Sequence, residues 1–178
     1  TKVAEEKKLS VVAGLYLRYD LANREAINRV KDGAIGDVVA VEVNFMRNPY
    51  RVNKRNPAWS EMEWQCRNWY HFTWLSGDDV VQSLVHSIDI AQEAVGDPAP
   101  LYGHALGGRS ASFGPEFGNT FDHAAPMFEY PSGMRMYGFD RTQYGCHGGF
   151  STVLLGSKGR CELIRRQSIV GETNWRYE

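Results

Sequence analysis

The most regular alternation of apolar and polar positions in the chain covers residues 76–96. Apolar residues recur there at helical spacing, which predicts one amphipathic helix that ends at Gly96. Its apolar face consists of Val81, Leu84, Val85, Ile88, Ala91 and Val95. A second, polar stripe consists of Gln82, His86, Asp89 and Glu93. The stretch contains no lysine or arginine, so the stripe is either an ordinary solvated face or one that presents His86 for proton transfer.

The first half of the chain contains three further patterned stretches. Residues 9–17 form a nearly continuous apolar run, which is typical of a strand buried on both faces of a parallel sheet. No second run of this kind follows, so the neighbours of such a strand are missing from this sequence. Asp20 is placed to cap a helix that ends near Asp32, with Gly33 as its terminator. Residues 38–45 alternate between apolar and polar positions and predict a half-buried strand.

The rest of the chain predicts one long loop and a run of strands. Residues 48–65 contain two prolines, several aromatic residues and arginines, which indicates an irregular loop that is either functional or a surface excursion held by aromatic packing. Strands are expected at residues 101–109, 120–130, 134–141, 150–155 and 160–164. Because short turns join these strands, the sheet should be largely antiparallel. Two helices cover only one of its faces, which predicts a two-layer α+β domain with an open-faced sheet.

Composition narrows the classes of partner. The chain has 178 residues with a net charge of −1, which suits one soluble domain and gives no support for binding to nucleic acid or to an anionic membrane. No apolar run reaches the length of a membrane span, and the choice between a cytoplasmic and an exported protein stays open. Cys66, Cys146 and Cys161 are odd in number and lack metal-ligand spacing, so we interpret them as free thiols.

Several short motifs resemble the Gfo/Idh/MocA family, which includes glucose–fructose oxidoreductase and inositol dehydrogenase. The segment from Val85 to Asp89 is similar to the His-x-x-Asp helix of that family. The supporting motifs, in the family's order, are GLYLRYD at residues 14–20, KDGAIGD at 31–37, WYHFTWLSG at 69–77, GNTFDH at 118–123 and GSKGR at 156–160. No single motif is specific, but their order and spacing cover nearly the whole chain. The branch that the chain resembles has an Asn-x-x-Asp-His strand and a Trp-Tyr loop in its second domain.

The resemblance implies a division of the chain and a set of partners. Residues 1–17 would be the remnant of a dinucleotide-binding domain, with residues 9–17 as its last strand. Residues 18–178 would be the substrate-binding and oligomerisation domain, similar to the second domains of dihydrodipicolinate reductase and glyceraldehyde-3-phosphate dehydrogenase. NAD or NADP would bind to the missing Rossmann domain, since no G-x-G-x-x-G fingerprint occurs here. We therefore expect this chain alone to bind no nicotinamide cofactor, to be inactive, and to form a homo-oligomer, most simply a dimer through the open sheet face.

The resemblance also assigns site residues. His86 would be the catalytic residue beside the substrate hydroxyl, and Gln82 stands where many members carry an aspartate. Asp89, one helical turn after His86, is placed to orient the imidazole ring. The expected substrate-binding residues are Arg18, Tyr19, Trp69, Tyr70, Gln82, Asp89, His123 and Arg141. Trp69 and Tyr70 would either stack on a sugar ring or pack within the loop. His104 and His147 receive no role.

Three functions remain open at this point. The first is the substrate-binding domain of an NAD(P)-dependent oxidoreductase that acts on a sugar, cyclitol or glycoside. The second is the same domain in a glycosidase or lyase that oxidises a hydroxyl transiently. The third is a non-catalytic oligomerisation module that uses the open sheet face. A metal site formed by His86, Asp89 and His123 is possible from ligand type, but the family does not generally use a metal, so none is expected.

Overall fold

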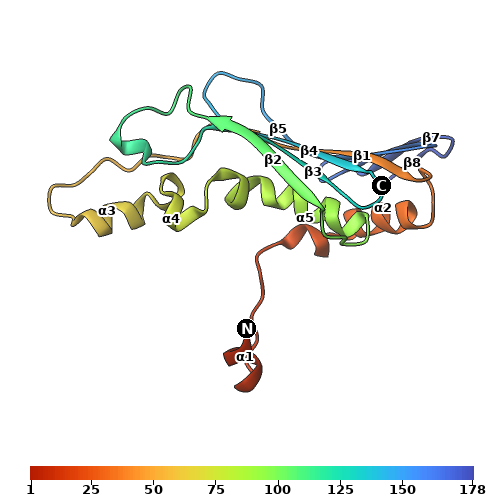
Figure 1. Ribbon diagram of the computed structural model, residues 1–178, viewed down its shortest axis with the longest axis horizontal. Coiled ribbons are helices and arrows are strands. Elements are labelled where there is room, and N and C mark those ends of the chain that lie inside the picture. The colour runs from red at the N-terminus through yellow and green to blue at the C-terminus, as the bar shows by residue number, and fades with distance from the viewer.

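The computed structural model describes all 178 residues and shows one large sheet with helices on one of its faces (Figure 1). Its eight strands lie in the order β2-β3-β4-β1-β5-β6-β7-β8. They are β1 (Val38–Arg47), β2 (Tyr102–Gly108), β3 (His123–Glu129), β4 (Arg135–Thr142), β5 (Gly149–Gly156), β6 (Gly159–Leu163), β7 (Ser168–Gly171) and β8 (Trp175–Arg176). Only β1 and β4 run parallel, and the other neighbours are antiparallel. The predicted α+β class with a largely antiparallel, open-faced sheet is confirmed.

The helical layer is built from short pieces rather than from two long helices. The α-helices are α1 (Lys2–Glu6), α2 (Leu21–Lys31), α3 (Glu61–Arg67), α4 (Thr73–Ser76) and α5 (Val85–Ala94). Tighter or wider turns are η1 (Tyr16–Tyr19), η2 (Trp69–His71), η3 (Val80–Leu84, a π-helical turn) and η4 (Pro115–Phe117). None of the helices is both long enough and apolar enough to cross a membrane.

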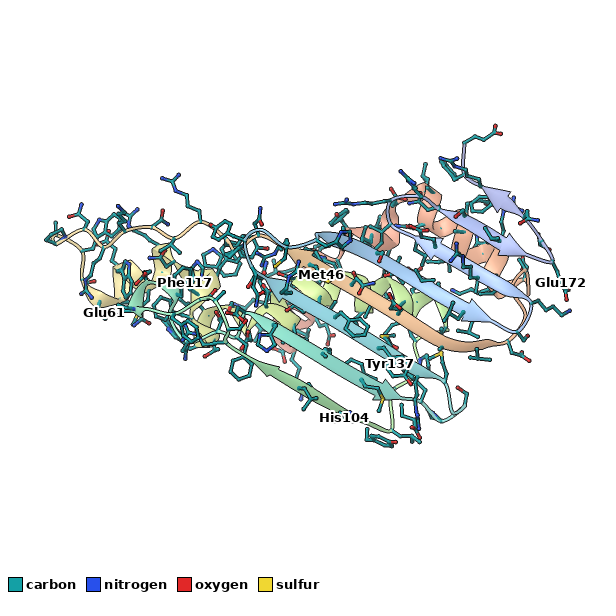
Figure 2. The ribbon with its side chains drawn as sticks, turned by 90° about the horizontal axis from the view of Figure 1, so that it is seen from above. Met46, Glu61, His104, Phe117, Tyr137 and Glu172 are labelled. Carbon is teal, nitrogen blue, oxygen red and sulfur yellow. The ribbon has the colours of Figure 1, made fainter.

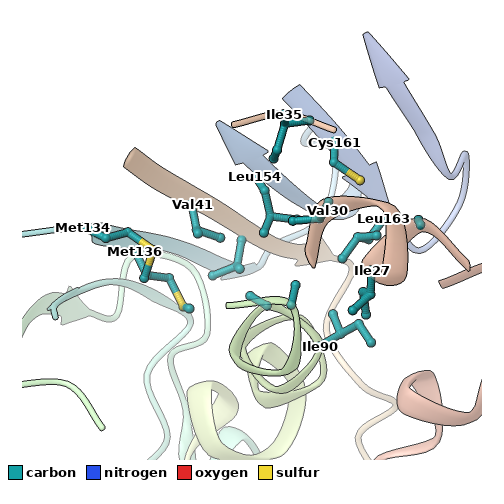
Figure 3. Packing of buried hydrophobic residues seen from close by; sticks show 14 of the residues in the cluster. Ile27, Val30, Ile35, Val41, Ile90, Met134, Met136, Leu154, Cys161 and Leu163 are labelled. Atoms are coloured by element: carbon teal, nitrogen blue, oxygen red, sulfur yellow. The ribbon is translucent and has the colours of Figure 1, made fainter. Parts of the chain in front are cut away.

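Helix α2 forms as its sequence signals predict. The Asp20 carboxylate accepts a hydrogen bond of 2.9 Å from the Asn23 N–H and caps the helix. Gly33, with a φ of +88°, follows the helix end. Ile27 and Val30 point into a core that α2 and α5 share with β1, β5 and β6 (Figure 3). This packing fixes both helices on the same face of the sheet.

The predicted helix over residues 76–96 is interrupted, and this corrects our expectation. Gly77 and Asp78 both have a positive φ, of +76° and +74°, so an α-helix cannot pass through them. The Asp78 carboxylate accepts hydrogen bonds from the N–H groups of Asp79 and Phe121, which holds this break in place. The chain then makes the π-helical turn η3 before α5 begins. As a consequence Val81 is 60% exposed instead of lying on the apolar face.

Two other predictions are corrected by the structure. Residues 9–17 do not form a strand: Leu9, Val11 and Val12 are exposed, and the run ends in η1, where Leu17 is buried. A strand of a parallel sheet needs hydrogen-bonded neighbours, and this chain supplies none for it. Within the predicted loop of residues 48–65, Ser60 caps α3 by accepting the Glu63 N–H at 3.1 Å. Strands β7 and β8 were not predicted either.

Candidate functional site

His86 is the second residue of α5 and lies on the helical side of the domain, partly buried. The ring centroids of Tyr16 and Phe45 lie 5.9 and 6.5 Å from that of its imidazole. Its Nδ1 atom is buried and has no hydrogen-bond partner. The N-terminal segment leaves the domain from this same helical side (Figure 1). Packing therefore holds the imidazole in place and leaves both ring nitrogens without a hydrogen bond, of which only Nε2 is accessible.

Asp89 does not orient the His86 ring, contrary to our expectation. Its two carboxylate oxygens accept hydrogen bonds of 2.8 Å each from Nε and Nη2 of Arg18. The same guanidinium also donates to both oxygens of Asp97, at 3.1 and 2.9 Å. Hydrogen bonds to Asp89 and then to Asp97 raise the pKa of Arg18 above its already high value. The two bonds between Arg18 and Asp89 connect η1 to α5 and so place Tyr16 beside His86. Tyr19, in contrast, is exposed.

Gln82 belongs to a different polar group, at the turn before α5. Its side-chain oxygen lies within hydrogen-bond distance of the Ser83 hydroxyl. That hydroxyl donates to Asp79 Oδ1 at 2.8 Å. Arg47, at the end of β1, donates to the same Asp79 oxygen at 2.6 Å and to Ser83 Oγ at 3.1 Å. Gln82 thus makes its contacts towards the sheet, away from the imidazole.

Asp79 and Asp140, which we call the acid pair, lie next to each other under this turn. Asp79 Oδ2 and Asp140 Oδ1 are both buried, and neither has a hydrogen-bond donor among the other residues. Burial, followed by the charge and the hydrogen bond of Asp79, raises the pKa of Asp140 to about 9. At neutral pH Asp140 therefore keeps its proton. Sequence reasoning missed the acid pair; its only signal was an aspartate on the same face of β4 as the apolar Met136.

The Trp-Tyr loop forms an ordered stack. The ring centroids of Trp69 and Tyr70 are 3.7 Å apart, and those of Tyr70 and Tyr50 are 3.6 Å apart. The Arg47 guanidinium carbon lies 3.4 Å from the Tyr50 ring centroid. Tyr70 has a ring on each side, so it cannot stack on a ligand, which corrects its predicted role. Trp69 ends the stack and is 38% exposed, so it alone keeps an accessible ring.

His123 and Arg141 lie on the other side of the sheet from His86. They are directly paired across β3 and β4. Burial alternates along β4, with Asp140 turned towards the helices, so Arg141 and His123 face the open side. There the Arg141 guanidinium contacts the His147 carbonyl oxygen. The structure therefore does not bring these two predicted residues into the His86 site.

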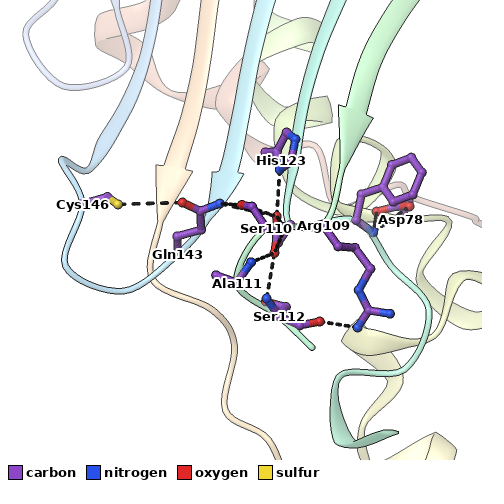
Figure 4. Close-up of polar contacts among 10 residues, drawn as sticks. Asp78, Arg109, Ser110, Ala111, Ser112, His123, Gln143 and Cys146 are labelled. Atoms are coloured by element: carbon purple, nitrogen blue, oxygen red, sulfur yellow. Dashed lines mark hydrogen bonds and ion pairs between the residues drawn. The ribbon is translucent and has the colours of Figure 1, made fainter. Parts of the chain in front are cut away.

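The histidine on the open face is held by a carboxylate with its own structural role. His123 Nδ1 lies 2.8 Å from Asp122 Oδ1 (Figure 4). Asp122 also accepts the N–H groups of Ser110, Ala111 and Ser112. Burial raises the pKa of Asp122, but these N–H groups and His123 lower it more, to a net value well below the ordinary one. The three ligands considered for a metal are thus separated, and no three His, Cys, Asp or Glu side chains gather as a metal site would require.

Two hollows lie near the ends of β1 and β5. The larger groove, about 990 Å³, is lined by residues of the loop at 49–55, by α3 and by η4, and contains none of the predicted site residues. The smaller one, about 500 Å³, is lined by Phe45 and Phe150 and by two arginines, Arg47 and Arg165. Because Phe45 also packs against His86, we treat this smaller space, the Arg165 hollow, as the one next to the candidate catalytic residue.

Comparison with known proteins agrees with the fold. The chain is 26% identical over 133 residues to 2,7-anhydro-N-acetylneuraminate hydratase from Escherichia coli, covering 74% of this chain and 32% of that protein. It is similar to the crystal structure of aldose-aldose oxidoreductase from Caulobacter crescentus, with a TM-score of 0.74, 20% identity, and coverage of 99% of this chain and 50% of the other. It is also similar to an inositol dehydrogenase homologue from Azotobacter vinelandii in complex with NADH and myo-inositol, with a TM-score of 0.70, 14% identity, and coverage of 99% and 44%.

The chain thus spans about a third of the curated relative and about half of the solved structures. The family model described as the C-terminal alpha/beta domain of an oxidoreductase family matches residues 27–176, which is most of the chain. The chain therefore belongs to the Gfo/Idh/MocA family of oxidoreductases, of which it forms the C-terminal alpha/beta domain.

Proposed function

We propose that this chain is the substrate-binding domain of an NAD(P)-dependent oxidoreductase that acts on a sugar, a cyclitol or a glycoside. The observation that carries the proposal is His86, an imidazole whose Nε2 is neither buried nor hydrogen-bonded, on the side of the domain from which the N-terminal segment leaves. A dinucleotide-binding domain joined before residue 18 would lie on this side. Family membership and the likeness to sugar and inositol oxidoreductases support the same function.

In the proposed reaction, the residues of this chain bind the substrate and move a proton. The nicotinamide cofactor, when bound, accepts the hydride from the carbon that carries the hydroxyl. His86 Nδ1 is buried, whereas Nε2 is neither buried nor hydrogen-bonded within the chain, so Nε2 is the nitrogen available to accept the hydroxyl proton as a general base. Trp69, as the accessible end of the aromatic stack, offers a ring for an apolar sugar face. Arg18 holds η1 and Tyr16 in place beside the imidazole.

Steady-state kinetics of the full-length enzyme test this role. We expect H86A to lower kcat by roughly 10²- to 10⁴-fold, the usual contribution of a general base. The matched control is H104A, because His104 is exposed on the edge strand β2 (Figure 2) and contacts none of the residues around His86. Formation of NADH or NADPH from sugars and cyclitols is the readout. Unchanged turnover in H86A would favour the oligomerisation module instead.

We also propose that the cofactor is held outside this chain. The sequence contains no G-x-G-x-x-G turn to hold a pyrophosphate. Calorimetric titration of the isolated 178-residue chain with NAD and NADP should give no binding. Micromolar affinity for either one would contradict this assignment.

A second candidate function is cleavage of a glycoside or a related bond through transient oxidation. It is favoured by the Escherichia coli relative, which is named as a hydratase rather than as a dehydrogenase. Incubation of the full-length enzyme with glycosides separates the two functions. Release of free sugar without net NADH supports the second candidate, and stoichiometric NADH supports simple oxidation.

The open sheet face is proposed as the surface of a homodimer. Large apolar side chains are exposed along it, including Phe139 on β4, Leu155 on β5 and Val170 on β7. Figure 2 looks onto this face, where Tyr137 is labelled. A face of this kind without a covering layer is typical of an association surface. Light scattering over a dilution series tests it, and a monomer at every concentration would refute it.

A further inference from the structure

The Arg165 hollow lies one aromatic ring away from His86. Phe45 and Phe150 pack edge-on in its wall, with ring centroids 4.8 Å apart. The other side of Phe45 faces His86, at 6.5 Å between ring centroids. At about 500 Å³ the hollow has room for part of a sugar-sized ligand. The Phe45 ring thus borders both the imidazole and the hollow.

The charges around the hollow have one sign. Arg47 and Arg165 are its only charged lining residues, and no carboxylate lines it. Arg47 is engaged by Asp79 at 2.6 Å and by the Asn48 carbonyl oxygen at 2.9 Å. Arg165 takes part in none of the ion pairs of the structure. Arg165 is thus an exposed guanidinium at the hollow that pairs with no protein carboxylate.

The backbone before Arg165 is held in an unusual conformation. Ile164 has a φ of +86°, which a β-branched residue rarely adopts. Its N–H donates to Oδ1 of the fully buried Asn23 at 2.9 Å. Its carbonyl oxygen accepts from Gln167 Nε2 at 3.0 Å. These bonds fix the turn after β6, so the backbone of Arg165 is placed at the hollow before any ligand arrives.

We infer that the substrate is a sugar acid whose carboxylate is bound by Arg165 in this hollow. A guanidinium presents parallel N–H donors that match the two oxygens of a carboxylate. The inference rests on the proposed function, because His86 defines where the rest of the substrate lies. Arg165 binds the substrate and takes no part in proton transfer.

Binding measurements on the full-length enzyme test the inference without requiring turnover. The probes are D-glucuronate and D-glucose, which differ at the carboxylate, and glucose 6-phosphate as a phosphate probe. We expect D-glucuronate to bind more tightly than D-glucose, and R165Q to weaken D-glucuronate binding by roughly tenfold or more. R165Q should leave D-glucose binding unchanged. The matched control is R166Q, because Arg166 is the next residue in the turn and does not line the hollow.

Three outcomes overturn the inference. They are equal binding of D-glucuronate and D-glucose, unchanged D-glucuronate binding in R165Q, and tighter binding of glucose 6-phosphate than of D-glucuronate. The H86A variant separates this test from that of the proposed function. Loss of D-glucuronate selectivity in R165Q supports the anion site even if H86A keeps full turnover, which would contradict only the role of His86.

Discussion

Replacement of Asp140 by asparagine should remove the pH dependence that the acid pair gives to stability. Asp140 is buried on β4, and its Oδ1 faces Asp79 without any other donor. The facing charges are Asp79 and Asp78, which raise the pKa of Asp140, and Arg47, which lowers it. An asparagine has the same shape and supplies an N–H donor to Asp79 at every pH. Asp79 keeps its bonds to Arg47 and Ser83 in this variant.

The size of the effect follows from proton linkage. The folded protein retains the Asp140 proton up to about pH 9, whereas an ordinary aspartate loses it near 3.8. The folded state therefore binds more protons than the unfolded state between these values, so stability falls as the pH rises through this window. A difference of one proton corresponds to roughly 1.4 kcal/mol per pH unit. From pH 6 to pH 8 the wild-type protein should lose about 3 kcal/mol that D140N does not lose.

Urea unfolding followed by tryptophan fluorescence at pH 6, 7 and 8 measures this difference. We expect the free energy of unfolding of D140N to gain on that of the wild type with each step in pH. The control is D32N, which changes an exposed carboxylate at the end of α2 and should run parallel to the wild type. Parallel curves for D140N and the wild type would refute a shared, buried proton.

Three other predictions concern single residues. The two exposed cysteines should react with a thiol reagent in the folded protein, whereas Cys161, whose pKa burial raises to about 12, should react only after unfolding, as mass spectrometry will show. R18Q should lower the free energy of unfolding by about 2 kcal/mol, since it removes a two-bond fork to a carboxylate, and a loss below about 0.5 kcal/mol would contradict this. G118A should lower the free energy of urea unfolding by more than about 2 kcal/mol, because a Cβ at Gly118 would lie 1.9 Å from the His71 carbonyl oxygen. The control G145A, also at positive φ but next to open space, should lower it by about 1 kcal/mol. Equal losses would refute the steric argument.

The elements that sequence patterns predict correctly are those with local signals. Helix α2 has its cap at Asp20 and its terminator at Gly33, and both act within a few residues of the helix ends. The prediction of one helix over residues 76–96 was wrong at Gly77 and Asp78, where hydrogen bonds to the Asp78 carboxylate hold the backbone outside helical φ/ψ values. Apolar periodicity continues through this break, so it does not report it. The prediction of a strand over residues 9–17 was wrong for another reason, because a buried strand needs neighbouring strands that its own pattern does not supply.

The sequence motif singles out His86 as the candidate residue, but it does not predict the contacts around it. His86 follows from the helix motif, yet the partner of Asp89 is Arg18, which lies 71 residues earlier. No helical spacing rule connects residues so far apart. His123 and Arg141 lie outside the site because alternate residues of β3 and β4 point to opposite faces of the sheet, and these two point to the open face.

The π-helical turn η3 explains how two polar groups can lie so close to each other and still act separately. A turn of this width places Ser83 inward, where it bonds Asp79 next to Asp140. His86 comes three residues later and faces Tyr16 and Phe45 instead. The carboxylates of Asp79 and Asp89, which come before and after His86 in the chain, are engaged by Arg47 and by Arg18. An imidazole without a carboxylate partner keeps a free nitrogen for substrate, and the bonds to these two arginines are what the sequence alone could not predict.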